Sequence, residues 1–270
     1  MQGEHWLSVG SLPERFDVWL KSHATSTMMQ RAEELPLRRD LLTLLTFIRD
    51  HKVVGTQSVG NMPLKAIREV TASFVDPPTL DQTVGGHTYH LRSEEDLWSL
   101  YFLRILAEVG GLLQTGRGRA WRLKRSGQAF LHTPAMLQVA YLLATWWYRT
   151  NWVVAFPVTG LAAGLPRGFQ ATALSCLRAL PVDQETPFEP FADGLVARSG
   201  LIWGSGESEF APMSLRSSVA RMVIQVLRDF GVLECRYEDR PIGTGKISTL
   251  VAFRVTSWGQ ALLNVLVTIR

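Results

Sequence analysis

Cysteine is scarce in this chain. It has two cysteines in 270 residues, Cys176 and Cys235, and they lack the C-x-x-C spacing. Two isolated cysteines form neither the disulfide framework of a small secreted protein nor a structural zinc site. The first residues also lack a basic segment followed by an apolar one, which is the pattern of a secretory signal peptide. These absences predict a cytoplasmic protein.

Apolar runs long enough to cross a membrane are missing too. The most apolar stretch extends from Met136 to Tyr148, and Arg149 and Asn151 follow it closely. A transmembrane helix needs about 20 predominantly apolar residues. We therefore expect no membrane partner and a buried helix that bridges two halves of the chain.

Motifs typical of a catalytic or metal site are also lacking. The stretch from Gly243 to Ser248 approaches a phosphate-binding loop, but Arg240 stands where that motif needs glycine and Ile247 where it needs serine or threonine. His87 and His90 have a spacing that two metal ligands can share, yet no third ligand of a suitable type is near in sequence. We predict a protein that is not an enzyme and that needs neither cofactor nor metal.

Acidic residues are absent from two stretches, although the whole chain has 28 basic and 24 acidic residues. The segment from Arg117 to Arg125 carries five basic residues and no acid, and the segment from Ile242 to Arg270 carries three and no acid. Such a segment is either an ordinary solvated face or a contact surface for nucleic-acid phosphates.

The same two stretches contain an internal repeat. "WRLKRSGQAFL", which begins at Trp121, aligns residue by residue with "FRVTSWGQALL", which begins at Phe253. Within these segments Gly127 matches Gly259, and each glycine is followed by Gln-Ala and then by two apolar residues. A repeat of this kind indicates that one structural unit occurs twice.

The repeat also extends upstream of these segments. Gly111 matches Gly231 with an offset of 120, whereas the offset at the aromatic positions is 132, so the second copy has 12 more residues in between. The pattern of each copy predicts a helix, a hairpin and a short helix. The additional residues of the second copy are expected at the exposed tip of its hairpin. We predict the two hairpin tips at residues 116–119 and 241–246.

Amphipathic patterns predict helices ahead of both hairpins, and "VDPPTL" and "TVGGHTY" are expected to be loops. The helix that precedes the first hairpin is expected to start with Ser93 and Asp96 and to end at Gly110 and Gly111. Helices are predicted over residues 13–23, 38–52, 62–74, 93–113, 169–180, 188–200 and 213–230.

Helices that lead into a two-stranded hairpin are the outline of a winged helix. The repeat resembles the strand and helix after the wing in bacterial winged helix-turn-helix regulators of the multiple-antibiotic-resistance type, through Arg254, Thr256 and Gly259 in the second copy. The threonine hydroxyl can cap the following helix, and the first copy, with Lys124 in its place, is expected to lack that cap. The resemblance implies a mainly α fold with small β-hairpin wings.

We therefore predict two winged-helix units joined by a helical bridge. Trp146 and Trp147 of the bridge should be buried, and together with Trp152 they either pack the two halves together or form a dimer interface. The predicted segments are an N-terminal lead-in at 1–37, a first winged-helix unit at 38–133, an apolar helical bridge at 134–168 and a second winged-helix unit at 169–270.

In a winged helix, the helix before the hairpin enters the major groove and the wing contacts phosphate or minor groove. The first such helix begins with three acids and is apolar nearly all round, which makes it a poor contact surface for DNA. The second has a polar face opposite an apolar stripe. Candidate DNA-binding residues are Ser214, Ser217, Ser218, Arg221, Gln225 and Arg228 on that helix, Lys246 and Arg254 on the second hairpin, Arg117, Arg119 and Arg122 on the first, and Lys65 and Arg68 on the helix at 62–74.

The predicted function is non-catalytic binding of duplex DNA, led by the second unit, in a transcriptional regulator or an accessory subunit of a DNA complex. The alternative is a protein–protein interaction module built on winged helices, as in chromosome-condensation accessory proteins. A homodimer or a larger protein complex stays open as a further association.

Overall fold

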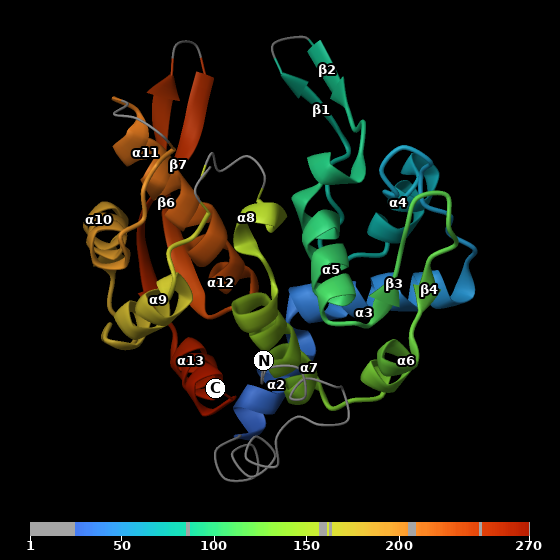
Figure 1. Cartoon of the computed structure of the whole chain (residues 1–270), viewed down its shortest axis with the longest axis horizontal. Helices are drawn as coiled ribbons and strands as arrows, with labels where there is room; N and C mark the ends of the chain where they lie inside the picture. Colours follow the sequence, from blue (N-terminus) through green and yellow to red (C-terminus); the bar gives the residue numbers. More distant parts are fainter. Residues whose placement is uncertain are drawn as a thin grey trace. The chain divides into compact units, whose positions relative to one another are not determined.

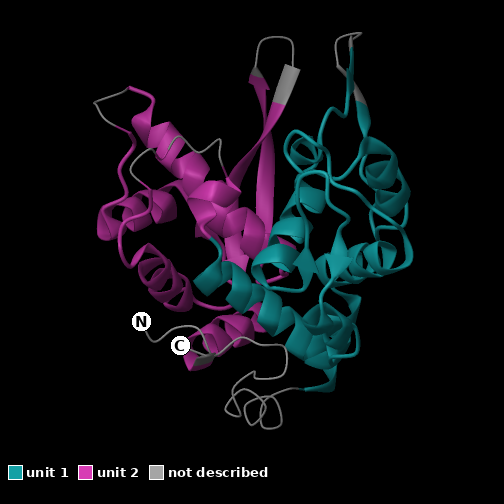
Figure 2. Cartoon of the chain, turned by 45° about the vertical axis from the view of Figure 1, so that its right-hand side comes forward, with its two compact units in different colours: residues 1–150 teal, residues 151–270 magenta. Residues whose placement is uncertain are grey.

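The computed structural model describes residues 25–84, 87–156, 161, 164–204, 209–242 and 245–269, so the helix predicted at 13–23 lies outside the described residues. Contacts divide the chain into two compact units, residues 1–150 and 151–270 (Figures 1 and 2). The structure is mainly helical with small antiparallel sheets, which confirms the predicted class. None of the helices among the described residues is long and apolar enough to span a membrane.

The first unit combines helices with two short hairpins. Its described helices are α2 (Ser26–Glu34), α3 (Pro36–Asp50), α4 (Leu64–Thr71), α5 (Trp98–Val109), α6 (Arg125–Leu131) and α7 (Ala135–Ala144), with a 3₁₀ turn η1 (Glu94–Asp96) before α5 and a π-helical turn η2 (Thr145–Arg149) after α7. Its described strands are β1 (Asp81–Val84), β2 (His87–His90), β3 (Leu113–Gln114) and β4 (Arg122–Leu123).

Helix α3 forms where the spacing of apolar residues predicts it, and Pro36 occupies its first turn. Leu41, Leu45 and Ile48 recur at helical spacing and are buried. The same helix contacts α5, α6 and α7. It is therefore the element around which the first unit packs.

The predicted helix at 93–113 is interrupted at Leu97, so that a short 3₁₀ turn precedes α5. The Asp96 carboxylate accepts a hydrogen bond from the backbone N–H of Ser93 at 3.1 Å, which confirms the predicted start. Helix α5 ends at Val109, and Gly111 follows with a positive φ of 70°. The left-handed conformation explains why the chain has glycine at this helix end.

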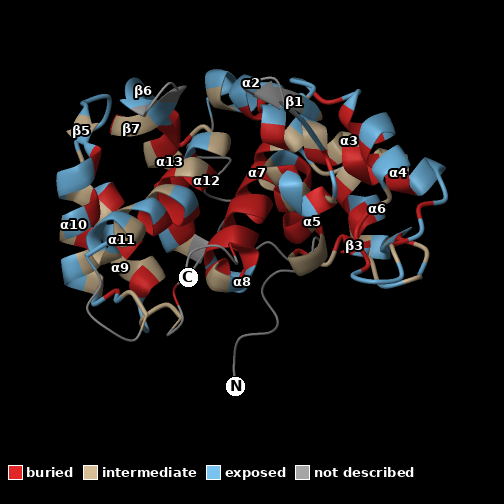
Figure 3. Ribbon diagram, turned by 90° about the horizontal axis from the view of Figure 1, so that it is seen from above, coloured by how far each residue is buried: buried red, intermediate tan, exposed pale blue. Residues whose placement is uncertain are grey.

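Trp146 and Trp147 are buried, with exposed fractions of 0% and 1%, as predicted. The Trp146 ring packs edge-on against Phe102 of α5 with ring centroids 5.3 Å apart, and helix α7 before it is largely buried (Figure 3). Trp152, in contrast, contacts Phe169 in the second unit. The predicted bridge at 134–168 is thus divided between the two units at residue 150. That these tryptophans join the two halves stays a prediction.

The loop prediction for "TVGGHTY" is wrong, because most of this segment forms an antiparallel hairpin of β1 and β2. Val84 pairs with His87 and Asp81 pairs with His90. Two glycines between two strands have the spacing of a two-residue hairpin connection, and this was the overlooked signal. The His90 ring lies 3.1 Å from the Asp81 carboxylate. Within the described ranges, no group of three or more His, Cys, Asp or Glu side chains is arranged to hold a metal.

The second unit contains a three-stranded sheet of order β5-β7-β6. Helices α11 and α12, with η4 between them, form the helix predicted at 213–230, but its middle is π-helical. The described helices are α8 (Trp152–Ala155), α9 (Phe169–Arg178), α10 (Phe188–Ser199), α11 (Ala211–Val219), the π-helical turn η4 (Ala220–Gln225), α12 (Val226–Asp229) and α13 (Ser257–Ile269), and the strands are β5 (Thr186–Pro187), β6 (Leu233–Ile242) and β7 (Gly245–Val255).

The second hairpin (β6, β7 and their connection) has a shorter tip than predicted. Pro241 pairs with Lys246 and Ile242 pairs with Gly245, so both strands continue through most of the predicted tip. The 12 additional residues therefore lengthen the strands, because each added pair extends the ladder of backbone hydrogen bonds. The first hairpin (β3, β4 and their connection) has the predicted turn at 116–119, where Gly118 has a φ of 60°.

The two hairpins share the same register. Leu113 pairs with Leu123 in the first, and Leu233 pairs with Val255 in the second. These two pairs occupy equivalent positions of the repeat, with offsets of 120 and 132. The repeat read from the sequence is therefore a repeat of three-dimensional structure.

A third segment also pairs with each hairpin at the same place. Val54 pairs with Ala120 in the first unit, and Pro187 pairs with Ala252 in the second. Ala120 and Ala252 are equivalent in the repeat, with the offset of 132. Both units therefore contain a helix, a short extended segment, two helices, a hairpin and a helix in this order, and the first unit has the β1–β2 hairpin inserted between its two helices.

The repeated glycine of the Gly-Gln-Ala segment has a steric reason. A Cβ on Gly127 would collide with the carbonyl oxygen of Leu112, and a Cβ on Gly259 would collide with that of Val232. The helices α6 and α13 thus begin against the backbone that enters each hairpin, at a distance that only glycine permits.

The helix caps differ between the copies as predicted. Thr256 Oγ1 accepts a hydrogen bond from the Gly259 backbone N–H at 2.8 Å at the start of α13, whereas the side chain of Lys124 makes no cap at the start of α6. In the first copy, Ser126 Oγ instead donates to the Gly111 carbonyl at 2.6 Å.

Candidate nucleic-acid interface

The first hairpin directs alternate side chains toward the core and toward solvent. Trp121 is buried at 3% exposure, whereas its neighbour Arg122 is exposed. Arg122 pairs in register with Gln114 across the hairpin, and opposite residues of an antiparallel pair project from the same face. Gln114 and Arg122 therefore share the outer face.

Five cations gather on this hairpin and at the start of α6, and we call them the basic cluster. All five side chains are exposed, and none forms an ion pair with any carboxylate in the part of the chain that the structure describes. They differ in this respect from most of the candidate arginines elsewhere. The members of the basic cluster are Arg117, Arg119, Arg122, Lys124 and Arg125.

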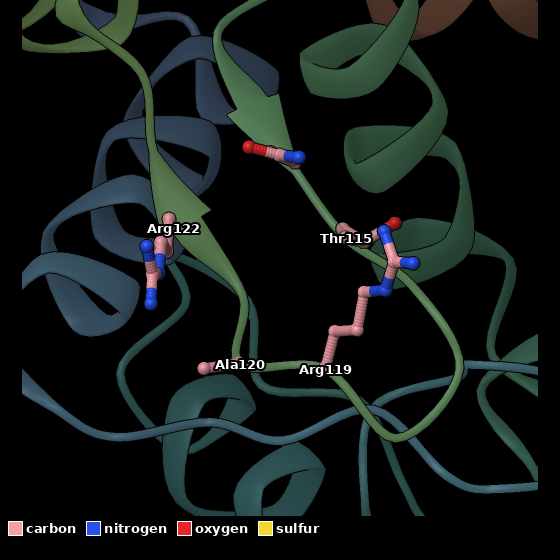
Figure 4. Close-up of a pocket in the computed structure, with 5 residues that line it drawn as sticks. Thr115, Arg119, Ala120 and Arg122 are labelled. Carbon is pink, nitrogen blue, oxygen red and sulfur yellow. The ribbon is translucent and has the colours of Figure 1, made fainter.

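A hollow of about 310 Å³ lies against the outer face of the first hairpin. It is lined by Gln114, Thr115, Arg119, Ala120 and Arg122, among which there is no acidic and no aromatic side chain. Figure 4 shows the Arg119 side chain extending toward Thr115, while Arg122 projects from β4. Two guanidinium groups, a hydroxyl and an amide can all donate hydrogen bonds to an anion.

Two arginines of the second hairpin, Arg236 and Arg254, are neutralised by acids of their own unit, whereas Arg240 on β6 is exposed and forms no ion pair within the described ranges. Arg254 lies 2.5 Å from the Glu234 carboxylate, and hydrogen bonding to Glu234, together with its charge, raises the pKa of Arg254. Arg236 pairs with Glu185 at 2.8 Å and with Glu238 at 2.5 Å. The predicted contact residue Arg254 is therefore already paired, while the side chain of Lys246 lies outside the described part.

The helix before the second hairpin also offers fewer free groups than predicted. Arg228 pairs with Asp229 at 2.8 Å and donates to the Tyr237 hydroxyl at 3.1 Å. Arg221, in contrast, is exposed and forms no ion pair within the described ranges. One of the two predicted arginines on this helix is thus free and the other is held.

The prediction that Ser218 faces DNA is wrong. Ser218 is buried at 2% exposure, and its hydroxyl donates to the Ser214 carbonyl at 2.9 Å. It lies one turn before Met222, at the edge of the buried face, and that face is wider than the predicted stripe because Ile224 and Leu227 are also buried. Of the other predicted polar residues, Ser217 is exposed and Ser214 and Gln225 are half-buried.

The cations on α4 form a third group. Arg68 pairs with Asp81 at 3.3 Å. Lys65 is exposed and lies 3.9 Å from Glu69 one helical turn away. Both cations have an acidic neighbour, unlike the members of the basic cluster.

Helix α5 precedes the first hairpin, and it is buried as expected. Glu94, in the turn before it, is fully buried and lies 2.5 Å from Arg104, which also pairs with Glu108 at 2.9 Å. Burial raises the pKa of Glu94, against the opposing effect of Arg104. These charges hold the helix in place, and the exposed acids Glu95 and Asp96 beside them would repel phosphate.

Three members of the basic cluster are candidate contacts by sequence. The other two members and two polar residues of the hollow were not among the sequence candidates. Lys124 and Arg125 belong to the same acid-free stretch, and Gln114 and Thr115 complete the hollow. The position of Gln114 follows from the hairpin register, so counting back from the paired leucines would have located it opposite Arg122.

Comparisons with known proteins add no family to this description. No protein-family model matches the chain, and searches of curated proteins and of solved structures found no significant match. We therefore infer the function from the chemistry of the site.

Proposed function

We propose that the chain binds duplex DNA through the first hairpin and that each unit is a winged helix. The order of elements supports the fold: a helix, a short extended segment, two helices and a hairpin occur in both units, with the β1–β2 hairpin inserted between the two helices of the first. This is the order in which winged helix-turn-helix domains are built. The hairpins would then be the wings.

The observation that carries this proposal is the basic cluster. Its five exposed cations have no carboxylate partner among the described residues, so their charge is available to an external anion. Phosphate contacts by such cations release counterions from DNA and supply most of the sequence-independent affinity. An arginine that is already paired, such as Arg254, must first exchange its partner.

The first unit would bind through its wing and not through the helix before it. Glu95 and Asp96 are exposed next to α5 and repel phosphate, whereas the first hairpin presents cations only. Contacts of this kind fix the protein on the duplex and read little base sequence. We therefore propose a non-catalytic, sequence-tolerant DNA-binding protein that acts as a regulator or as an accessory subunit of a DNA complex.

The test is a titration of a mixed-sequence duplex at several salt concentrations. The wild-type affinity should fall steeply with salt, with a log–log slope of roughly −0.9 for each phosphate neutralised. The double variant Arg117→Gln and Arg125→Gln should weaken binding and reduce this slope by about two units. Both residues lie outside the lining of the hollow.

Arg167→Gln is the matched control, because Arg167 is exposed, forms no ion pair within the described ranges and lies outside both hairpins. It should leave the slope unchanged. The proposal fails if the folded wild-type protein does not bind the duplex at low salt, or if the double variant behaves like the control.

The second candidate function is a protein–protein interaction module, and the second unit favours it. Arg216 of α11 pairs with two acids of α10, Glu189 at 2.9 Å and Asp193 at 2.6 Å. The charge of Arg216 is therefore neutralised within the second unit. Ile202 and Met213 are 58% and 65% exposed, and exposed apolar side chains are typical of contact surfaces. A folded chain that binds no DNA at low salt would favour this function.

A further inference from the structure

We infer that the hollow on the first hairpin binds a terminal phosphate, the phosphomonoester at the end of a DNA strand. This inference rests on the proposed function and names the part of the DNA that the site prefers. It concerns Gln114, Thr115, Arg119 and Arg122, which line the hollow with Ala120.

The charge of the lining matches a phosphomonoester better than an internal phosphodiester. A terminal phosphate carries about −1.5 to −2 charges at neutral pH and three unesterified oxygens, whereas an internal phosphodiester carries a single charge. Arg119 and Arg122 supply two guanidinium groups, whose planar donors suit phosphate oxygens. Thr115 and Gln114 add neutral donors, and none of the described residues that line the hollow is acidic.

The shape of the site also favours an end of the strand. An internal phosphate is attached to a sugar on both sides and lies on the convex surface of the duplex, so it enters a hollow only if the chain on both sides follows. A terminal phosphate is attached on one side and can enter by itself. An unstacked base is a poor occupant, because base binding of this kind uses aromatic side chains and the described lining residues include none.

The second hairpin shows how the equivalent arginine is neutralised when an acid stands opposite it. At the equivalent positions Glu234 lies opposite Arg254, and its carboxylate forms an ion pair with the guanidinium. In the first hairpin the residue opposite Arg122 is Gln114, whose amide is neutral. The replacement of a carboxylate by an amide at one position of the repeat thus leaves Arg122 available to an external anion.

The experiment compares short duplexes of one sequence that carry either a terminal phosphate or a terminal hydroxyl, at the 5′ or the 3′ end. Binding is measured by fluorescence anisotropy at a fixed salt concentration. We expect the wild-type protein to prefer a phosphorylated end by about tenfold or more, the effect of one good charge-assisted contact. Equal affinity for phosphorylated and hydroxyl ends in the wild type overturns the inference.

Gln114→Glu is the decisive variant, because it removes no cation and recreates the pairing of the second hairpin. It should abolish the preference for phosphate while the melting temperature stays as in the wild type. The double variant Arg117→Gln and Arg125→Gln should weaken binding to both ends and keep the preference. A Gln114→Glu protein that keeps the full preference also overturns the inference.

These outcomes separate the inference from the proposed function. If neither duplex binds at low salt, the proposed function fails. If both duplexes bind equally and binding depends on salt and on Arg117 and Arg125, the proposed function stands and only the terminal-phosphate inference fails.

Discussion

Arg254 lies directly across the second hairpin from Glu234, with its guanidinium 2.5 Å from the carboxylate. The equivalent residues of the first hairpin, Arg122 and Gln114, are paired in the same register, but the amide carries no charge to neutralise the arginine. The two copies therefore share this register and differ in the charge opposite the arginine.

The Arg254–Glu234 pair masks charge and adds little stability, because both side chains are about half exposed and solvent screens the attraction. We therefore expect Glu234→Gln to leave the urea unfolding midpoint unchanged within the precision of the measurement. Equilibrium unfolding followed by circular dichroism tests this expectation. A clear drop in the midpoint would show that the pair is a structural element of the hairpin.

Gly259→Ala should destabilise the second unit by about 1–3 kcal/mol, because the added methyl group collides with the Val232 carbonyl. Gly194→Ala is the matched control: this glycine lies inside α10, and nothing stands within 4 Å of its Cβ position. The control should stabilise the helix by about 0.5–1 kcal/mol. Urea unfolding measures both variants, and equal effects would contradict the close-approach explanation.

The two helix caps allow a reciprocal test. Thr256→Val should cost about 0.5–2 kcal/mol, since the Gly259 N–H then loses its side-chain acceptor. Lys124→Thr installs the missing cap at the start of α6 and should raise stability by about 0.5–1 kcal/mol. Thermal unfolding of both variants is the measurement. A Lys124→Thr protein that melts below the wild type would show that the first copy cannot accept this cap.

Burial raises the pKa of the Cys235 thiol from its ordinary value of 9.0 to about 11. The thiolate is the reactive form, and a rise of two pKa units lowers its population at pH 8 about 100-fold. In a Cys176→Ser protein, alkylation of the folded chain at pH 8 should be slower than in denaturant by about this factor. The rate should increase about tenfold per pH unit until about pH 11.

The same shift also predicts how stability depends on pH. Between about pH 9 and pH 11 the folded state keeps the Cys235 proton that the unfolded chain loses, so the unfolding free energy should fall as pH rises through this window. A folded-state alkylation rate equal to that of the denatured chain would contradict both expectations.

Trp146 is fully buried against Phe102, so Trp146→Ala should lower the unfolding free energy by about 3–5 kcal/mol through loss of apolar burial and formation of a cavity. Val154→Ala is the comparison, because Val154 is 67% exposed and surface truncations usually change stability by less than about 0.5 kcal/mol. Urea unfolding distinguishes the two. Similar midpoints would show that the Trp146 site collapses without a cavity.

The sequence by itself determined the repeat and its local structure. Gly111 and Gly231 end the helices before the hairpins with φ values of 70° and 67°, and Gly127 and Gly259 permit the next helix to start against the chain. These features depend on residues close in sequence, and their physical causes act over one or two turns. Most of the described helices, the two hairpins of the repeat and the burial of Trp146 were therefore predictable, whereas α2, which lies in the predicted lead-in, and the β1–β2 hairpin were not predicted.

Tertiary structure alone decided which cations remain free. Arg216 pairs with Asp193 and Glu189, which lie 23 and 27 residues away, and Arg236 pairs with Glu185 at a separation of 51. A charge count along the chain cannot foresee such partners, because an ion pair depends on which side chains the fold brings within a few ångströms. The π-helical turn η4 and the burial of Ser218 likewise follow from packing, which overrides the regular helical period used to assign faces in the sequence. For these reasons the sequence pointed to the second unit, whereas the fold pairs Arg228 and Arg254 there and leaves five neighbouring cations of the first hairpin and the start of α6 without an ion pair among the described residues.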